Sequence, residues 1–145
     1  MKKYILKSDK YPNMCIDDNG SSVRGQHYLH LWQCEKYNRN QQFIFDSSNN
    51  KKEKCTFKLK NTNKKNLCID DAGNITTHKP YHIMWSCDEN SENQEYNIYD
   101  YVQENGVKKI KIRNPHKKLW VSTNGNKIKY DKCEHSDWFI PLNVQ

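Results

Sequence analysis

Short segments in which apolar residues alternate with polar ones recur along this chain at regular intervals. Alternation with a period of two is the pattern of a strand with one face buried. No stretch shows the 3.6-residue periodicity of an amphipathic helix, so we expect strands and no substantial helix. The alternating segments that open each group of strands contain the pairs Tyr4 and Leu6, Phe57 and Leu59, and Ile110 and Ile112.

The same order of elements follows each opening strand. A polar turn (SDKYPN, NTNKKN or NPHKK) leads to a short strand, which is centred on CID in the first two groups. A second short strand (LHLWQC or HIMWSC) returns from a glycine tip, and a polar loop leads to a closing strand (QQFIF, QEYNIY or DWFIP). The tip glycines are Gly20, Gly73 and Gly125. Four strands in each of three groups predict about twelve strands.

The groups are internal repeats, because one offset relates their residues. CIDD occurs at 15–18 and again at 68–71, an offset of 53 positions that also relates two tryptophans and two Asn-Gln pairs. Such self-similarity is the signature of a repeated structural unit. The third copy begins in register at Ile110 but is about six residues shorter before Cys133. The repeats cover about residues 1–52, 53–105 and 106–145.

Three β repeats of this size predict an all-β fold of the β-trefoil type, a six-stranded barrel capped by three hairpins. A chain of 145 residues is expected to form one domain, here residues 1–145. The hydrophobic share is only 34% and the mean hydropathy is −1.14, but the aromatic share of 12% argues against disorder. A loop-rich β-domain with a small core fits these values.

The net charge of +7 and the pI of about 9.0 permit an acidic partner such as a nucleic acid, a sulfated glycan or a membrane surface. The lysines are scattered over loops and exposed strand positions, however, and there is neither an arginine cluster nor an RNA-binding aromatic motif. We therefore expect no nucleic-acid binding. We also expect no membrane insertion, because no apolar run approaches the ~20 residues of a membrane span.

Six cysteines in a small domain indicate disulfides and an oxidising compartment. Two pairs have the same separation of 19 residues, which predicts Cys15–Cys34 and Cys68–Cys87. Cys55 and Cys133 could form a third bridge, stay unpaired or link two chains. The N-terminal MKKYILKSD has no hydrophobic signal core, so a signal peptide has been removed or never existed. We expect a secreted or extracellular protein.

The pattern C-I-D, L-W-x-C and N-Q-x-F resembles the ricin B-chain lectin family, whose units carry C-x-D, Q-x-W and N-Q-x-W. The resemblance extends over essentially the whole chain. Two departures stand out: the glutamine of Q-x-W reads His30 in the first repeat and Ile83 in the second. The closing aromatic position is expected to be Phe43, Tyr96 and Trp138 in the three repeats. The resemblance implies galactose or N-acetylgalactosamine as the usual ligand.

A neutral sugar needs a fixed acceptor, an amide and a flat aromatic ring. The aspartate of CID would accept from two neighbouring hydroxyls, the asparagine would donate, the tryptophan would stack on the C–H face, and the glutamine would brace the aspartate or the asparagine. The residue two before the tryptophan would line the site. The candidate carbohydrate-binding residues are Asp17, His30, Trp32, Asn40 and Gln41 in the first repeat, and Asp70, Ile83, Trp85, Asn93 and Gln94 in the second.

No sugar site is expected in the third repeat. Ser122 stands where the aspartate should be, Asp131 replaces the tryptophan, and the Asn-Gln pair is absent from EHSDW. Catalysis is not expected either, because neighbouring strand residues such as Asp17 and Asp18 point to opposite faces and do not share a pocket easily. We predict no cofactor, and no metal because metal-ligand spacing is absent.

Three functional classes follow. The first is a non-enzymatic, two-site lectin for galactose-type sugars, used in adhesion to glycans or glycoproteins on cell surfaces. The second is a basic trefoil that binds sulfated polysaccharide through lysine clusters, with the steep salt dependence that such binding implies. The third is a scaffold for protein interaction, for example an inhibitor acting through a loop.

Overall fold

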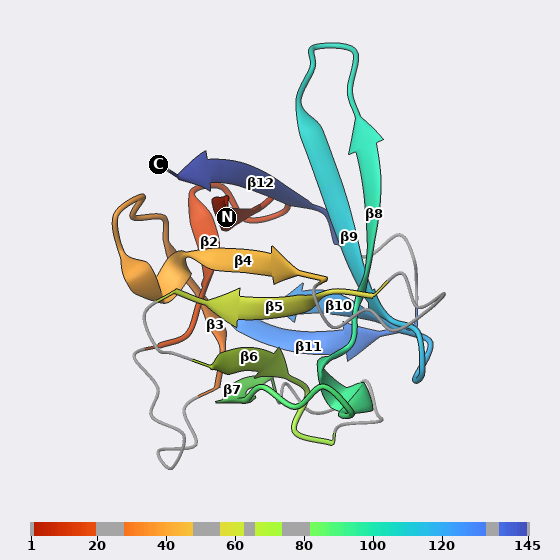
Figure 1. Ribbon diagram of the computed structural model, residues 1–145. Helices are drawn as coiled ribbons and strands as arrows, with labels where there is room; N and C mark the ends of the chain where they lie inside the picture. The colour runs from red at the N-terminus through yellow and green to blue at the C-terminus, as the bar shows by residue number, and fades with distance from the viewer. Residues whose placement is uncertain are drawn as a thin grey trace.

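The computed structural model describes residues 2–19, 28–47, 56–62, 66–73, 82–132 and 137–144 (Figure 1). These residues form twelve strands and two 3-10 turns, each turn only three residues long and far too short to cross a lipid bilayer. The strands are β1 (Lys3–Ser8), β2 (Met14–Asp17), β3 (His30–Gln33), β4 (Phe43–Asp46), β5 (Lys58–Asn61), β6 (Leu67–Asp70), β7 (Ile83–Ser86), β8 (Asn97–Val102), β9 (Lys108–Asn114), β10 (Leu119–Asn124), β11 (Lys127–Asp131) and β12 (Phe139–Val144). The 3-10 turns are η1 (Arg39–Gln41) and η2 (Glu92–Gln94).

The opening and closing strands of the repeats form a closed barrel. β1 pairs with β4, β4 with β5, β8 with β9, β9 with β12, and β12 with β1. The remaining joint, between β5 and β8, is a bridge from Phe57 to Tyr96. This ring is the predicted six-stranded barrel. A longer circuit through β10, β11, β3 and β2 also closes, because β11 pairs with β3.

One aromatic ring per repeat fills an equivalent position inside the barrel. Phe43, Tyr96 and Phe139 have no exposed surface, and each pairs with the opening strand of its own repeat. The prediction that Trp138 fills the third position is therefore wrong by one residue. Because side chains alternate across a strand, Trp138 faces the opposite way and remains partly exposed.

Three hairpins, β2–β3, β6–β7 and β10–β11, cap one end of the barrel. Each hairpin has a buried residue at the same repeat position, three residues before the tryptophan position of its return strand. These residues are Leu29, His82 and Ile128. The N–H of Leu29 donates to the carbonyl of His82 at 2.7 Å, and Nδ1 of His82 lies 3.4 Å from the carbonyl oxygen of Ile128. The cap therefore contains a buried imidazole, whose ring packs edge-on against that of Tyr130 with centroids 4.6 Å apart.

Glycine occupies two of the predicted hairpin tips because the backbone there is left-handed. Gly73 has φ of 75° and Gly125 has φ of 61°. Residues with a Cβ rarely adopt this conformation, whereas glycine does so at little cost. The third predicted tip, Gly20, lies outside the described residues.

Both predicted disulfides are present. Cys15–Cys34 and Cys68–Cys87 join paired strands of one hairpin each, with Cα–Cα distances of 5.0 and 5.1 Å. Cys55 and Cys133 lie outside the described residues.

Removing either disulfide should lower the stability appreciably. A bridge of this separation is worth roughly 3 kcal/mol in the chain-entropy model. We expect the double variant Cys15→Ala/Cys34→Ala, and separately Cys68→Ala/Cys87→Ala, to lose about that much free energy of unfolding in urea titrations. A loss below ~1 kcal/mol in both variants would show that the bridges do little for stability in this fold.

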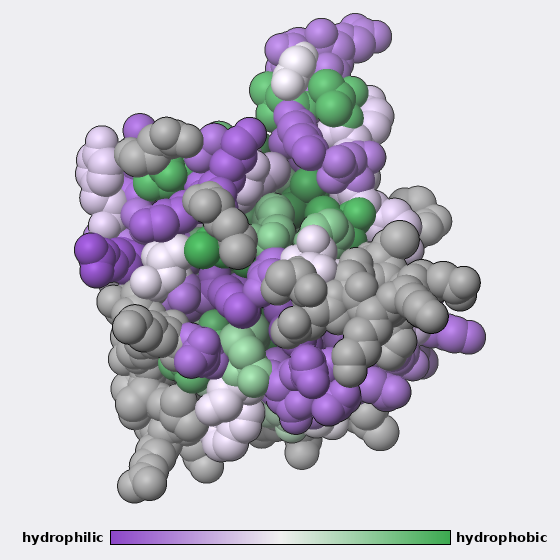
Figure 2. All heavy atoms as spheres, in the orientation of Figure 1, coloured by the Kyte–Doolittle hydropathy of each residue, from purple (hydrophilic) through white to green (hydrophobic). Residues whose placement is uncertain are grey.

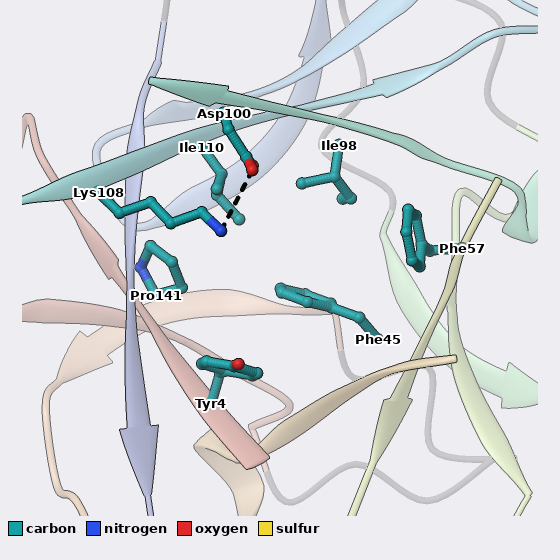
Figure 3. Close-up of a pocket in the computed structure, with 8 residues that line it drawn as sticks. All are labelled: Tyr4, Phe45, Phe57, Ile98, Asp100, Lys108, Ile110 and Pro141. Atoms are coloured by element: carbon teal, nitrogen blue, oxygen red, sulfur yellow. Dashed lines mark ion pairs between the residues drawn. The ribbon is translucent and has the colours of Figure 1, made fainter. Parts of the chain in front are cut away.

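The other end of the barrel opens into a cavity of about 260 Å³ (Figure 3). The Tyr4 and Phe45 rings stack against each other in its wall, with centroids 5.4 Å apart. Lys108 and Asp100 form an ion pair there at 3.2 Å, and both side chains are about half exposed. Figure 2 shows hydrophobic atoms gathered on this face below the projecting β8–β9 hairpin. The lining is mainly apolar: Tyr4, Phe45, Phe57, Ile98, Asp100, Lys108, Ile110 and Pro141.

Candidate functional site

A shallow cavity of about 280 Å³ lies on the first hairpin. β2 ends at Asp17, which pairs with His30 at the start of β3, and the alternation of β3 brings Trp32 to the same face as His30. Four of the five residues predicted for the first repeat line this cavity, and the fifth, Gln41, lies buried behind it. The lining consists of Asp17, Asn19, His30, Trp32, Asn38 and Asn40.

Asp17 is fixed at the base of this cavity, with only 4% of its surface exposed. Its Oδ2 accepts from Nε2 of Gln41 at 2.9 Å, and its Oδ1 accepts from the N–H of Asn19 at 2.6 Å. Nε2 of His30 lies 3.2 Å from the same Oδ1. Each carboxylate oxygen has more than one acceptor site, so the carboxylate is held in place while it can still accept from a ligand.

Gln41 is the brace that the sequence predicted. Its Nε2 also donates to the carbonyl of Gln33 at 2.9 Å, and its Oε1 accepts from the N–H of Glu35 at 2.8 Å. The amide is therefore fully used within the protein and does not face a ligand. The short turn η1 places it there, with Asn38 capping the turn by accepting from the N–H of Asn40 at 2.9 Å.

Trp32 forms the wall of the first cavity and is 51% exposed. Its ring stacks beside that of His30, with centroids 5.5 Å apart and planes 22° from parallel. A large aromatic side chain that stays half exposed on a rigid strand offers a flat apolar face to a ligand.

The second hairpin repeats this arrangement around a cavity of about 350 Å³. Nε2 of Gln94 donates to Oδ2 of Asp70 at 2.9 Å and to the carbonyl of Ser86 at 2.8 Å, and Trp85 is 45% exposed. Ile83 stands at the position of His30, so among the described residues no imidazole lines this cavity. The lining consists of Asp70, Ala72, Gly73, Ile83, Trp85 and Asn93.

A lysine from the third repeat reaches the second cavity. Nζ of Lys117 donates to Oδ1 of Asn93 at 2.9 Å and to Oδ2 of Asp71 at 2.5 Å. Because Oδ1 of the Asn93 side chain accepts from Lys117, the Nδ2 of the same amide can act as the donor toward a ligand. Oδ2 of Asp71 also accepts from the hydroxyl of Tyr130 at 2.7 Å. Burial raises the pKa of Asp71, and the bonds from Lys117 and Tyr130 oppose this rise.

The third hairpin uses the equivalent positions differently. In register with the first two repeats, Asp131 lies opposite Trp120, where the other hairpins place their tryptophans, and Ser122 takes the aspartate position. The hydroxyl of Ser122 donates to Asp137, which also accepts from the N–H and hydroxyl of Thr123 at 2.9 and 3.0 Å. Asp137, at the glutamine position, is 5% exposed. Its carboxylate is consumed by internal bonds rather than presented to a ligand.

Several lining residues were not predicted from the sequence. Asn19 and Asn38 in the first cavity, and Ala72 and Gly73 in the second, lie in turns that the repeat alignment treats as connections. Lys117 was missed because it belongs to another repeat, although its place in the polar turn NPHKK was visible. Within the described residues, there is no group of three or more histidine, cysteine, aspartate or glutamate side chains that could hold a metal ion.

Comparison with known families agrees with this geometry. The sequence profile described as "Ricin-type beta-trefoil lectin domain-like" matches residues 39–131, more than half of the chain. The chain belongs to this lectin family. No curated protein sequence matches this lectin domain.

Solved structures resemble the lectin domain over nearly its whole length. A mosquitocidal holotoxin matches with a TM-score of 0.74 at 16% identity, covering 99% of the domain and 17% of the toxin chain. SeviL bound to asialo-GM1 saccharide matches with a TM-score of 0.69 at 14% identity, covering 100% and 99%. The Vibrio vulnificus hemolysin/cytolysin β-trefoil lectin with bound N-acetyl-D-lactosamine matches with a TM-score of 0.63 at 16% identity, covering 100% and 96%. At these identities the likeness shows the fold, and the domain spans about a sixth of the holotoxin chain.

Proposed function

We propose that this domain binds galactose-type sugars through two sites, one on the first hairpin and one on the second, and that the third hairpin binds none. The observation that supports this most strongly is the duplication of one chemical set. A buried aspartate braced by a glutamine, an asparagine and a half-exposed tryptophan occur together around both cavities.

The set matches the surface of galactose or N-acetylgalactosamine. The aspartate accepts from two adjacent hydroxyls, one of them the axial hydroxyl that distinguishes galactose from glucose, and the asparagine amide donates to the same pair. The apolar C–H face that lies opposite then rests on the tryptophan ring. A structurally similar Polyporus squamosus lectin is bound to the epitope Neu5Aca2-6Galb1-4GlcNAc, and the Vibrio vulnificus lectin holds N-acetyl-D-lactosamine.

Two weak sites on one rigid domain suit recognition of glycans on cell surfaces. A single monosaccharide contact of this kind is expected to bind at about the millimolar level, or about −4 kcal/mol. Engaging both sites on a multivalent glycan would raise the avidity by roughly 10²–10⁴ if the spacing allows it. The two disulfides agree with a secreted domain, since disulfides persist in oxidising compartments. Its proposed role is adhesion or the targeting of a larger protein, without catalysis.

Tryptophan indole NMR signals provide the test. Galactose and N-acetylgalactosamine should shift two signals saturably, one lost in Trp32→Ala and the other in Trp85→Ala, with little change between 50 and 500 mM salt. Glucose, which lacks the axial hydroxyl, is the matched control and should shift neither signal. Absence of any saturable shift with galactose or N-acetylgalactosamine would remove this function, and the duplicated set would then serve the scaffold.

A further inference from the structure

Four aromatic rings lie together on the outer side of the β8–β9 hairpin. Tyr99 and Tyr101 belong to β8, Trp120 belongs to β10, and Trp138 directly precedes β12. The ring centroids of Tyr99 and Trp120 are 5.2 Å apart, and those of Tyr101 and Trp138 are 5.9 Å apart. The two tyrosines are 43% and 53% exposed. We call these four residues the aromatic face. It shares no residue with the two cavities on the hairpins.

Two cations lie against the aromatic face. Nζ of Lys111 is 4.7 Å from the ring centroid of Trp138 and 5.6 Å from that of Trp120, although Lys111 is only 7% exposed. The guanidinium carbon of Arg113 is 5.5 Å from the Trp120 centroid. Within the described ranges, neither cation forms an ion pair, and Nε of Arg113 is buried without a hydrogen-bond partner.

The second repeat also has a buried lysine at this place, whereas the first repeat has Ile5. Lys58 is the equivalent residue and is 6% exposed, with Asp46 opposite it on β4 and Glu95 directly before the closing aromatic residue. Asp46 pairs with Lys60 at 2.6 Å, and Nζ of Lys58 has no hydrogen-bond partner among the described residues, so the two carboxylates act on Lys58 through their charge. Burial lowers the pKa of Lys58, and nearby carboxylates including these two oppose this lowering. In the third repeat, the two carboxylate positions are Tyr99, which lies opposite the lysine on β8, and Trp138.

Rings have thus replaced both carboxylates around a retained, nine-tenths buried lysine. A buried charge is costly unless an opposite charge or strong hydrogen bonds compensate it. Cation–π contacts with two tryptophans supply part of that compensation. The remaining positive potential, next to exposed rings, favours an anionic group carried on a flat apolar body.

We propose that the aromatic face binds an anionic polysaccharide. The C–H faces of successive sugar rings would rest on the tyrosines and tryptophans, and their sulfate or carboxylate groups would pair with Lys111 and Arg113. This site is separate from the neutral-sugar sites, and its cations are two of the basic residues that give the domain its positive net charge.

A polysaccharide fits this face better than a single-stranded nucleic acid. In an acidic sugar, the charged group is a substituent of the ring that stacks, so it can reach a cation only 4.7 Å from a tryptophan centroid. In a nucleotide, the phosphate is joined to the base through the sugar and lies away from the stacked ring. The saccharide is therefore the occupant that the close spacing of rings and cations favours.

The test compares two lysines on the same strand. Lys111→Met and Lys108→Met remove the same charge, but the two side chains point to opposite faces of β9, and Lys108 lines the cavity at the barrel mouth. We expect a chondroitin sulfate hexasaccharide, titrated at 50 mM salt by calorimetry, to bind about tenfold more weakly to Lys111→Met. Lys108→Met should change binding by less than about twofold. Tyr101→Ala, at an exposed position, should also weaken binding severalfold.

Three further ligands separate the sources of binding. Chemically desulfated chondroitin retains the carboxylates. If it binds as tightly as the parent hexasaccharide, the carboxylates make the contact, and if its binding is lost, the sulfates do. Maltohexaose is neutral and should not bind. Equal losses in Lys111→Met and Lys108→Met, or no loss in Lys111→Met and Tyr101→Ala, would overturn the proposal. So would binding of a ten-residue oligothymidylate with none of the saccharides. Galactose titration of Lys111→Met should match wild type, which keeps this test distinct from that of the neutral-sugar sites.

Discussion

Replacing Lys117 with methionine should lower the free energy of unfolding by about 3–5 kcal/mol, because it strips the partner from a buried carboxylate. The Lys117 and Asp71 side chains are 12% and 0% exposed, and 2.5 Å separates Nζ from Oδ2. The hydroxyl of Tyr130, the amide of Asn114 and the N–H of Gly73 would remain as donors to Asp71, but none of them carries a charge. Urea unfolding at pH 7 measures the loss.

The same variant should affect one sugar site and not the other. Lys117 engages Oδ1 of Asn93 and so orients its amide toward the second cavity. Without it, the amide can turn, and the Trp85 indole signal should report several-fold weaker galactose binding. The Trp32 signal should titrate as in wild type, because the Lys117 partners Asp71 and Asn93 line no part of the first cavity.

Two variants serve as controls for Lys117→Met. The double variant Asp71→Asn/Lys117→Met removes both charges and should recover most of the lost stability. Lys109→Met breaks a more exposed pair, since its partner Asp9 is 35% exposed, and should cost about 0–1 kcal/mol. The loss in free energy of unfolding caused by Lys117→Met should also become smaller in acid. Asp71, whose pKa is raised, then becomes protonated in the folded state and no longer needs a cation beside it. A penalty no larger than that of Lys109→Met would contradict the prediction.

The second large effect concerns acid stability. His82 is completely buried in the cap, and burial lowers its pKa to about 4 from 6.5. As the pH falls below 6.5, the unfolded chain takes up a proton at this imidazole, whereas the folded chain does so only near pH 4. The stability that depends on neutral His82 is therefore fully present above pH 6.5 and is lost progressively as the pH falls to about 4. A shift of this size corresponds to about 3 kcal/mol.

His82→Leu should remove this acid-sensitive step, because leucine does not titrate. Leucine already occupies the equivalent position, Leu29, in the first repeat, so the substitution should fit the cap. The substitution also removes a buried Nε2 that has no hydrogen-bond partner among the described residues, so we expect no loss of stability at pH 7. Urea unfolding at pH 7, 6, 5 and 4 should show a decline that is about 3 kcal/mol smaller in the variant than in wild type. Parallel curves for the two proteins would show that His82 does not control acid stability.

Much of the candidate site was predictable because its parts are local and repeated. The constant offset of 53 residues aligned Asp17 with Asp70 and Trp32 with Trp85, and equal separations identified both disulfides. The alternation of each strand indicated which side chains share a face. These features depend on neighbours within one hairpin, and a pattern in the sequence records such neighbours directly.

The shortened third repeat is where the local pattern failed. With residues missing before Cys133, the sequence does not show where the gap ends, and Trp138 was placed where Phe139 packs. One position decides which side of the strand faces the core, so the slip exchanged a buried ring for a surface one. The correct register revealed Asp137 at the glutamine position and Trp138 beside Lys111.

The sequence by itself determined the strand order, the threefold repeat, the two disulfides and the paired sets of Asp, Asn, Gln and Trp, because each follows from spacing within a repeat. Only the tertiary structure decided what lies between repeats. Closing the barrel brings Lys117 of the third repeat to Asn93 of the second, and Tyr99 beside Trp120. Contacts between distant segments depend on how strands pair around the barrel, and that pairing is settled by burial of the common core rather than by any local pattern.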